Sequence, residues 1–152
     1  MTSHGFGVRP LQPDDRDAWF ELWAGYLDFY ETTLDVRISE TTWRRLLDPG
    51  EPMHGLIAVN ENEPVGLLNY VLHANTWTDR PVCYLEDLYV DPQARGQGAG
   101  RALIEGLVDL ARAAKWHRIY WQTRSGNKTA RSLYDKIGTL TDWVRYDVPI
   151  ES

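Results

Sequence analysis

The spacing of apolar residues along the chain predicts its first elements. Residues 8–11 could form a short strand. After Pro13, apolar residues recur every three or four positions, which predicts a first helix; they are Trp19, Leu22, Trp23, Tyr26, Leu27 and Tyr30. Ser39 is a residue type that caps helices, so it predicts the start of a second helix, which Asp48, Pro49 and Gly50 would end. Trp43, Leu46 and Leu47 are its apolar residues.

The rest of the chain alternates strands and helices. Residues 55–59 and 64–72 predict two antiparallel strands, joined by a polar turn of Asn60, Glu61, Asn62 and Glu63. Residues 82–90 predict the strongest strand, which a glycine-rich loop and a helix follow; Leu103, Leu107, Leu110 and Ala111 share one face of that helix. A strand (118–122), a helix (127–136) and a final strand (143–148) complete the order. We therefore expect an α/β (α+β) fold, a mixed sheet with helices on both faces.

Size, charge and cysteine content restrict the class of protein. The 152 residues are 43% hydrophobic, which suits a single domain, residues 1–152, with one core. The net charge of −6 argues against nucleic acid or an anionic membrane as the main partner. Cys83 is the single cysteine, so we expect no intrachain disulfide, no metal site and a reducing, cytoplasmic compartment. MTSHGFGVRP at the start lacks an apolar signal region, and no run approaches the roughly 20 apolar residues of a membrane span.

The loop at residues 91–107, DPQARGQGAGRALIEGL, places three glycines before a helix. A dinucleotide fingerprint would need a small residue where Arg101 stands, and a P-loop would need a Gly-Lys pair followed by Ser or Thr. What remains is Arg95, Gly98 and Gly100 at a helix N-terminus, where free N–H groups and the helix dipole favour an anion. This pattern predicts a diphosphate site; the alternative is a turn that only lets the helix pack close to its strand.

Two sequence blocks carry a resemblance to a known family. YLEDLYVDPQARGQGAGRALI resembles the acetyl-coenzyme A motif of the GCN5-related N-acetyltransferases (GNAT), with Arg95, Gly98 and Gly100 at its three defined positions. NKTARSLYDKIG, residues 127–138, is similar to the second family block. The resemblance extends over residues 6–148 and implies a GNAT-like fold with a largely antiparallel central sheet. WAGYLDFYE and CYLEDLYV resemble the subgroup of the yeast histone and other protein acetyltransferases, and the second also resembles diamine acetyltransferases.

The resemblance implies where acetyl-coenzyme A binds as co-substrate. It places Leu88, Tyr89 and Val90 against the cofactor arm, with the backbone groups of Leu88 and Val90 pairing with the pantetheine amides. The diphosphate would meet the N–H groups of Gly96, Gln97, Gly98, Ala99, Gly100 and Arg101, with Arg95 as charge partner. Asn127 would hold the later part of the arm; alternatively it only caps the helix that it begins. No metal is implied.

Acetyl transfer to an amine requires a base, because a lysine-like amine has a pKa of about 10.4 and arrives protonated. Strict alternation along residues 82–90 would place Tyr84, Glu86 and Leu88 on one face and Leu85, Asp87 and Tyr89 on the other. We predict Glu86 as the base, through a water, because it would share the face of Val90 and because diamine acetyltransferases carry an acid at the matching position. The alternative is a carboxylate in an ordinary cross-strand ion pair.

The leaving thiolate needs an acid, and Tyr134 occupies the family's tyrosine position; its alternative is an aromatic packed under the helix. The backbone N–H near Val90 is the family's oxyanion donor. For the acceptor we predict Tyr30, Glu86, Asp87 and Trp121, with Tyr26, Glu31 and Trp77 as further lining, whereas Trp19 and Trp23 have the spacing of core residues.

The expected activity is N-acetylation of a primary amine: a small amine, a polyamine, an amino acid or a protein lysine. A homodimer, formed with a second copy of the chain, is a further possible assembly. A non-catalytic module that binds acetyl-coenzyme A as a sensor would need neither Tyr134 nor Glu86, and a protein-binding scaffold would leave the glycine loop unexplained.

Overall fold

The computed structural model describes residues 6–151. The first five residues of the N-terminal segment MTSHGFGVRP lie outside this range. The chain divides into two compact units, Met1–Trp121 and Gln122–Ser152. The single domain over residues 1–152 stays a prediction.

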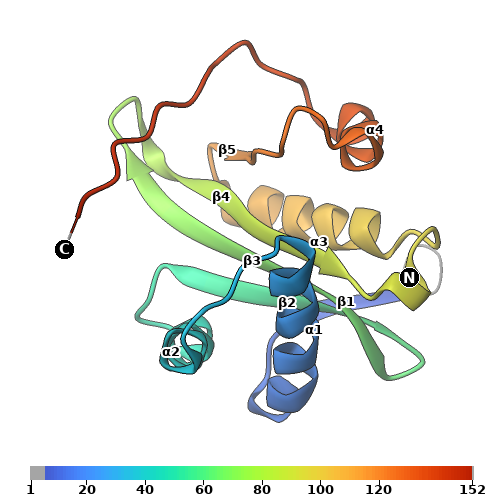
Figure 1. The fold of residues 1–152 in the computed structure, drawn as a ribbon. Helices are drawn as coiled ribbons and strands as arrows, with labels where there is room; N and C mark the ends of the chain where they lie inside the picture. Colours follow the sequence, from blue (N-terminus) through green and yellow to red (C-terminus); the bar gives the residue numbers. More distant parts are fainter. Residues whose placement is uncertain (1–5, 152) are drawn as a thin grey trace. The chain divides into compact units, whose positions relative to one another are not determined.

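The first unit is a five-stranded sheet with helices (Figure 1). Its elements are β1 (Phe6–Pro10), η2 (Pro13–Asp15), α1 (Arg16–Phe29), α2 (Val36–Leu47), β2 (Met53–Asn60), β3 (Glu63–Asn75), β4 (Thr78–Val90), η3 (Pro92–Ala94), α3 (Ala99–Ala114) and β5 (Arg118–Tyr120). The strands lie in sequence order, β1 to β4 antiparallel and β5 parallel to β4. The predicted fold class is confirmed. Strand β5 is shorter than predicted, because it ends at Tyr120 and the predicted strand extends to residue 122.

Helices cover both faces of this sheet. On one face, α1 and α2 bury an aromatic cluster around Trp19, Trp23 and Trp43, which also contains Leu67 of β3. On the other face, α3 packs against β1, where a Cβ at Gly106 would lie only 2.8 Å from a methyl carbon of Val8. The two faces are called the α1 face and the α3 face below. The prediction that Trp19 and Trp23 are core residues is confirmed, since they are 0% and 7% exposed.

Ser39 does not cap α2, contrary to the sequence prediction. The Asp35 side chain is the cap and accepts a 2.8 Å hydrogen bond from the Arg37 N–H. Ser39 lies one turn further on, buried, where its hydroxyl oxygen accepts a 3.0 Å hydrogen bond from the Trp23 indole N–H. The prediction failed because an isolated serine suits a cap as well as a buried acceptor, and only the neighbouring helix decides between them.

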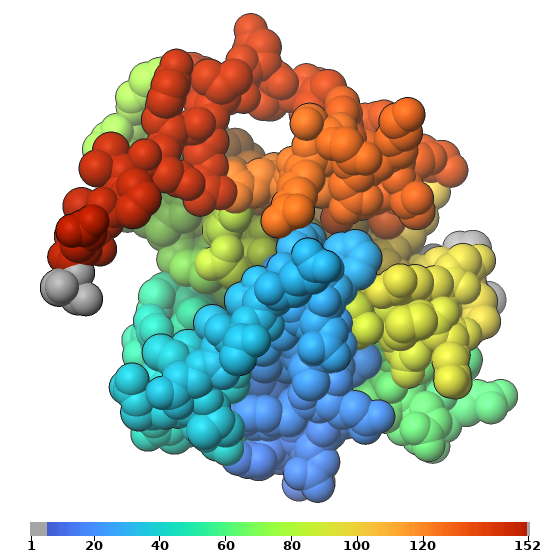
Figure 2. All heavy atoms as spheres, viewed as in Figure 1, coloured from blue at the N-terminus to red at the C-terminus, as the bar shows by residue number. Residues whose placement is uncertain are grey.

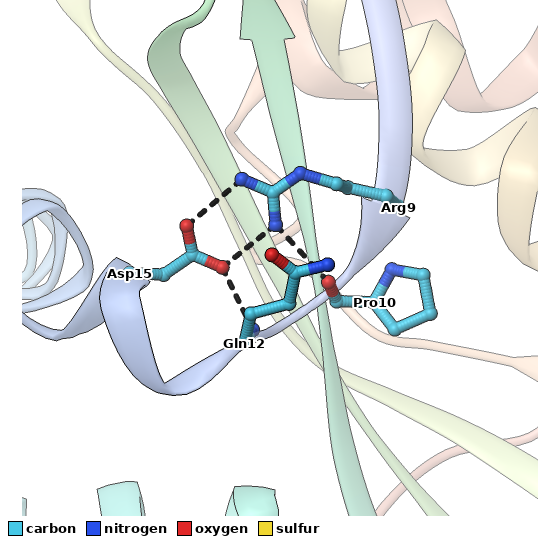
Figure 3. A network of polar contacts seen from close by, with 4 residues as sticks. All are labelled: Arg9, Pro10, Gln12 and Asp15. Atoms are coloured by element: carbon cyan, nitrogen blue, oxygen red, sulfur yellow. Dashed lines mark hydrogen bonds and ion pairs between the residues drawn. The ribbon is translucent and has the colours of Figure 1, made fainter.

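A buried carboxylate fixes the start of α1 (Figure 3). Asp15 is 5% exposed and receives both guanidinium arms of Arg9, at 2.7 and 2.9 Å, and the Gln12 N–H at 2.8 Å. The hydrogen bond between the Arg9 and Asp15 side chains is the main reason why the pKa of Asp15 is lowered and the pKa of Arg9 is raised. This contact ties β1 to the entrance of α1.

A β-bulge in β4 corrects the predicted alternation of its side chains. Asn69 of β3 lies opposite Asp87, but the next residue, Tyr70, lies opposite Leu85, so Glu86 is an extra residue between two ladder positions. Residues opposite each other share a face. Asp87 and Tyr89 therefore lie on the α1 face together with Tyr84, whereas Leu85, Leu88 and Val90 lie on the α3 face. Glu86 is exposed at the bulge and has no ladder partner, so the register does not place it on the face of Val90.

The second unit contains one helix, α4 (Lys128–Ile137), which agrees with the predicted helix. Asn127 is its N-cap and accepts a 3.3 Å hydrogen bond from the Ala130 N–H. The predicted strand at residues 143–148 is wrong: this segment has no strand partner and its side chains are exposed. Alternation alone does not make a strand, because the backbone groups also need a neighbouring strand to pair with. None of the described residues of this unit is buried.

Candidate active site

The edge of β4 opens where its pairing with β5 ends. The parallel ladder joins Val82, Cys83 and Tyr84 to the three residues of β5 and stops there. From Leu85 to Val90, β4 keeps its ladder with β3 but has none on the β5 side. Leu88, Tyr89 and Val90, the residues predicted to contact the cofactor arm, lie on this open edge. An extended chain with amide groups can pair there as an added strand would.

The loop after β4 leads into a helix N-terminus that is free to bind an anion. Gly96 and Gly98 have φ values of +79° and +94°, which favour glycine. Gly98 is the N-cap of α3 and offers no side-chain cap, and the Ala102 N–H makes a 2.9 Å hydrogen bond to its carbonyl. The preceding N–H groups, those of Ala99, Gly100 and Arg101, have no intrahelical acceptor. These groups and the open edge of β4 fit the diphosphate and the amide-bearing arm of coenzyme A.

Arg95 lies beside the end of α1 rather than at the start of α3. Its Nε donates a 3.1 Å hydrogen bond to the Val90 carbonyl, and its guanidinium carbon lies 5.4 Å from the Tyr89 ring centroid and 5.7 Å from that of Phe29. Figure 2 shows the yellow loop that contains Arg95 next to the light-blue end of α1 on the same surface. The side chain thus fixes the loop against α1, and its predicted contact with the diphosphate stays a prediction.

Asp87 is a largely buried carboxylate on the α1 face. The Asn69 amide donates a 3.1 Å hydrogen bond to its Oδ2, and the Tyr26 hydroxyl also interacts with it. Burial raises the pKa of Asp87 above the usual carboxyl value, although both hydrogen bonds oppose this shift. The pKa of Tyr26 is raised as well, first by burial and then by the charge of Asp87. Tyr26 therefore stays a neutral donor, and Asp87 binds protons more tightly than an exposed aspartate.

A second polar contact lies at the other end of the same face. The Tyr120 hydroxyl is 2.9 Å from His73 Nε2, and the Tyr120 and Tyr84 ring centroids are 4.9 Å apart. Glu86 acts electrostatically on both Tyr26 and Tyr120, raising the pKa of each. The bulge carboxylate therefore lies within electrostatic range of both polar groups, the Asp87 contact and the Tyr120 contact.

The other predicted site residues are more scattered. Tyr30 ends α1, with its ring 4.9 Å from the Tyr26 ring, whereas Trp77 is 89% exposed in the turn between β3 and β4. Trp121 is half-buried at the end of the first unit. Asn127 and Tyr134 belong to the second unit, where Asn127 is the cap expected as its alternative role and Tyr134 is half-buried on α4.

Sequence reasoning missed Asn69, His73 and Tyr120. Asn69 had a signal, because it is a single amide within the apolar run GLLNYVL of β3, where burial is expected. His73 and Tyr120 are 47 positions apart, and only the sheet brings them together. Among residues 6–151, no group of three or more His, Cys, Asp or Glu could hold a metal ion, and no helix is long and apolar enough to cross a bilayer.

Comparison with known proteins decides the family. The profile described as "Acetyltransferase (GNAT) family" matches residues 16–139, which is most of the chain. The chain belongs to the GNAT acetyltransferases. It is 34% identical to a D-amino-acid N-acetyltransferase of Saccharomyces cerevisiae over 148 residues, 96% of this chain and 92% of that protein. It is 36% identical to a thialysine N-epsilon-acetyltransferase of Caenorhabditis elegans over 132 residues, 87% of this chain and 81% of that protein.

Solved structures agree with this fold. A probable acetyltransferase superposes with a TM-score of 0.86 at 21% identity, over 96% of this chain and 99% of that one. An aminoglycoside acetyltransferase from an uncultured soil sample superposes with a TM-score of 0.81 at 19% identity, over 98% and 99%. This GNAT protein is therefore an acetyl-coenzyme A-dependent N-acetyltransferase, and the residues of its open β4 edge and α3 N-terminus are suited to that co-substrate.

Proposed function

We propose that this enzyme acetylates the primary amine of an amino acid or a related small cationic amine, which binds over the bulge of β4. The observation that supports the proposal is the pair of neighbouring carboxylates at the bulge, Glu86 exposed and Asp87 largely buried. Tyr26, Tyr84 and Tyr120 surround them with aromatic rings, and carboxylates together with aromatic faces attract an ammonium group. Tyr30 and Trp121 are the predicted outer contacts of the acceptor.

The names of the two relatives restrict the class of acceptor that we propose. One is named for D-amino acids and the other for thialysine, so an amino acid is the chemistry common to both names. We propose the same substrate class here, with acetylation at either the α-amine or a side-chain amine. Polyamines and protein lysines remain the competing acceptors in the test below.

The proposed reaction is direct attack of the neutral amine on the thioester. Glu86, through a water, or Asp87 takes the proton of the ammonium group. A raised pKa makes Asp87 a stronger base than an exposed aspartate, while the exposure of Glu86 gives it access to water. The backbone N–H near Val90 would stabilise the oxyanion, and Tyr134 would protonate the departing thiolate. Arg95, Gly96, Gln97 and Asn127 are proposed to hold coenzyme A with the α3 N-terminus.

The test is a screen of acceptors with acetyl-coenzyme A, following the release of free thiol. D- and L-amino acids, lysine analogues, diamines and a lysine peptide are compared by kcat/KM, and we expect an amino acid to be the best acceptor. Glu86→Gln and Asp87→Asn should each lower kcat/KM, with the larger loss for the true base, whereas Asp109→Asn, an exposed carboxylate on α3, serves as the control. Binding of acetyl-coenzyme A without turnover of any acceptor would instead identify a sensor module.

We further propose that the enzyme is a cytoplasmic homodimer that uses neither nucleic acid nor a membrane. The net charge of −6 and the single, buried Cys83 are consistent with this setting. Apolar side chains exposed on the second unit support a second copy as partner, since a surface of this kind favours association; they are Trp143, Val144, Tyr146, Val148 and Ile150. Sedimentation equilibrium tests the proposal, and a monomer at micromolar concentration would contradict it.

A further inference from the structure

His73 is held in one tautomer by its backbone neighbour. Its Nδ1 lies 2.8 Å from the Ala74 carbonyl oxygen, which can only accept a hydrogen bond. In the neutral ring Nδ1 therefore carries the hydrogen, and Nε2 has a free lone pair. The Tyr120 hydroxyl lies 2.9 Å from Nε2 and is the donor of that hydrogen bond. The hydrogen-bond network thus assigns a direction: phenol to imidazole to carbonyl.

Tyr120 lies where the pairing between β4 and β5 ends, next to the open edge of β4. It is the last residue of β5 that pairs with β4, and its partner Tyr84 is two residues before the bulge. The charged or titratable groups that act on its hydroxyl are Glu86 and Cys83 of β4 and Arg118 of β5. Burial raises the pKa of the Cys83 thiol to about 12, so this group is neutral at physiological pH. The acidic neighbour in reach of Tyr120 is thus Glu86.

We propose that Tyr120 and His73 form a proton relay for the acetyl transfer, in which Tyr120 contacts the acceptor amine and His73 receives the proton. This inference rests on the proposed function. Glu86 or Asp87 takes the proton of the ammonium group, and the relay takes the second proton that the nitrogen must lose. After the neutral amine has attacked the thioester, one N–H bond of its nitrogen breaks as the proton passes to the Tyr120 oxygen, directly or through one water. The Tyr120 O–H bond breaks as its hydrogen passes to His73 Nε2. The nitrogen keeps the electron pair of that bond in the new amide, and His73 becomes an imidazolium that still donates to Ala74.

The relay explains two features that a purely structural contact would not need. Tyr120 is 38% exposed although its hydroxyl has an internal acceptor. Part of the ring is therefore open to solvent where the pairing of β4 and β5 ends. Burial raises the pKa of Tyr120, which disfavours a free phenolate. A neutral phenol can still pass a proton on, because it accepts one hydrogen as it donates another.

The test compares pH profiles of kcat/KM for the best acceptor. Tyr120→Phe removes the transferable hydrogen, and His73→Gln keeps an acceptor for Tyr120 but cannot titrate. We expect each to lower kcat/KM by about 100-fold or more, within the range of about 100- to 10,000-fold typical of acid–base catalysis. The double variant should be no slower than the slower single variant, since both act in one path. His117→Gln changes a histidine that contacts Arg80, and it should leave the profile unchanged.

A readout without turnover keeps the test independent of folding and of the acceptor. Nitrogen NMR of the free enzyme should show His73 as the Nδ1–H tautomer, and Tyr120→Phe should shift the Nε2 resonance of His73 while His117→Gln should not. Wild-type activity in His73→Gln and Tyr120→Phe, or the Nε2–H tautomer, would overturn the relay alone. A wild-type protein that acetylates no amine would overturn the proposed function and the relay together.

Discussion

Asp15→Asn should destabilise the first unit strongly at neutral pH and weakly in acid. The carboxylate holds both guanidinium arms of Arg9 and the Gln12 N–H, and its side chain is 6% exposed. Removing one partner of a fully buried ion pair costs about 3–5 kcal/mol. The Arg9 side chain is 34% exposed, so water can partly solvate the guanidinium that is left. We therefore expect a loss of about 2 kcal/mol in the free energy of unfolding at pH 7.

The pH dependence has a definite sign. The pKa of Asp15 is lowered in the folded state, so its stabilisation is complete above the unfolded value of about 3.9 and is lost as the pH falls through the folded value. Urea unfolding at pH 7 and near pH 3, followed by tryptophan fluorescence, measures the difference between wild type and variant. That difference should shrink in acid, and Arg9→Met should show little further loss when added to Asp15→Asn. Equal stabilities at pH 7, or a difference that grows in acid, would refute the reasoning.

Three further substitutions test other parts of the site. Gly98→Val places a branched residue at a φ of +94° in the predicted diphosphate loop, so calorimetry should show at least tenfold weaker acetyl-coenzyme A binding, about 1.4 kcal/mol, in a protein with wild-type circular dichroism. Tyr134→Phe should lower turnover by about 100-fold or more and leave cofactor affinity nearly unchanged. Gly25→Ala would bring a Cβ within 2.5 Å of the Tyr89 hydroxyl, so thermal unfolding should show a loss of stability that Tyr89→Leu relieves. Unchanged values in these assays would contradict the respective role.

Local patterns predicted most of the first unit. Helix α1 followed from residues such as Trp19 and Trp23, because burial at helical spacing is a property of the segment itself. The order of β4, glycine loop and α3 followed from the glycine pattern and its match to family blocks. Both signals lie within short stretches of sequence, and the structure agrees with them at α1, β4 and α3.

The errors arose where a distant partner decides the outcome. Ser39 became the acceptor of a tryptophan from another helix, and residues 143–148 lack the strand partner that their alternation requires. The bulge at Glu86 could not be seen in the sequence, because it depends on the register with β3, and it removed the reason for preferring Glu86 over Asp87. The contact between His73 and Tyr120 arises from sheet order alone.

The bulge also means that the faces of β4 do not depend on Glu86. If this residue were skipped, the remaining ones would alternate without interruption from Val82 to Val90, with every side chain on the face that it already occupies. A shortened strand lacking Glu86 should therefore keep its buried contacts, because the deletion closes the bulge and leaves the alternation of the other side chains unchanged. Glu86 is therefore a position that evolution can remove from β4 without disturbing the register on which the two helical layers rest.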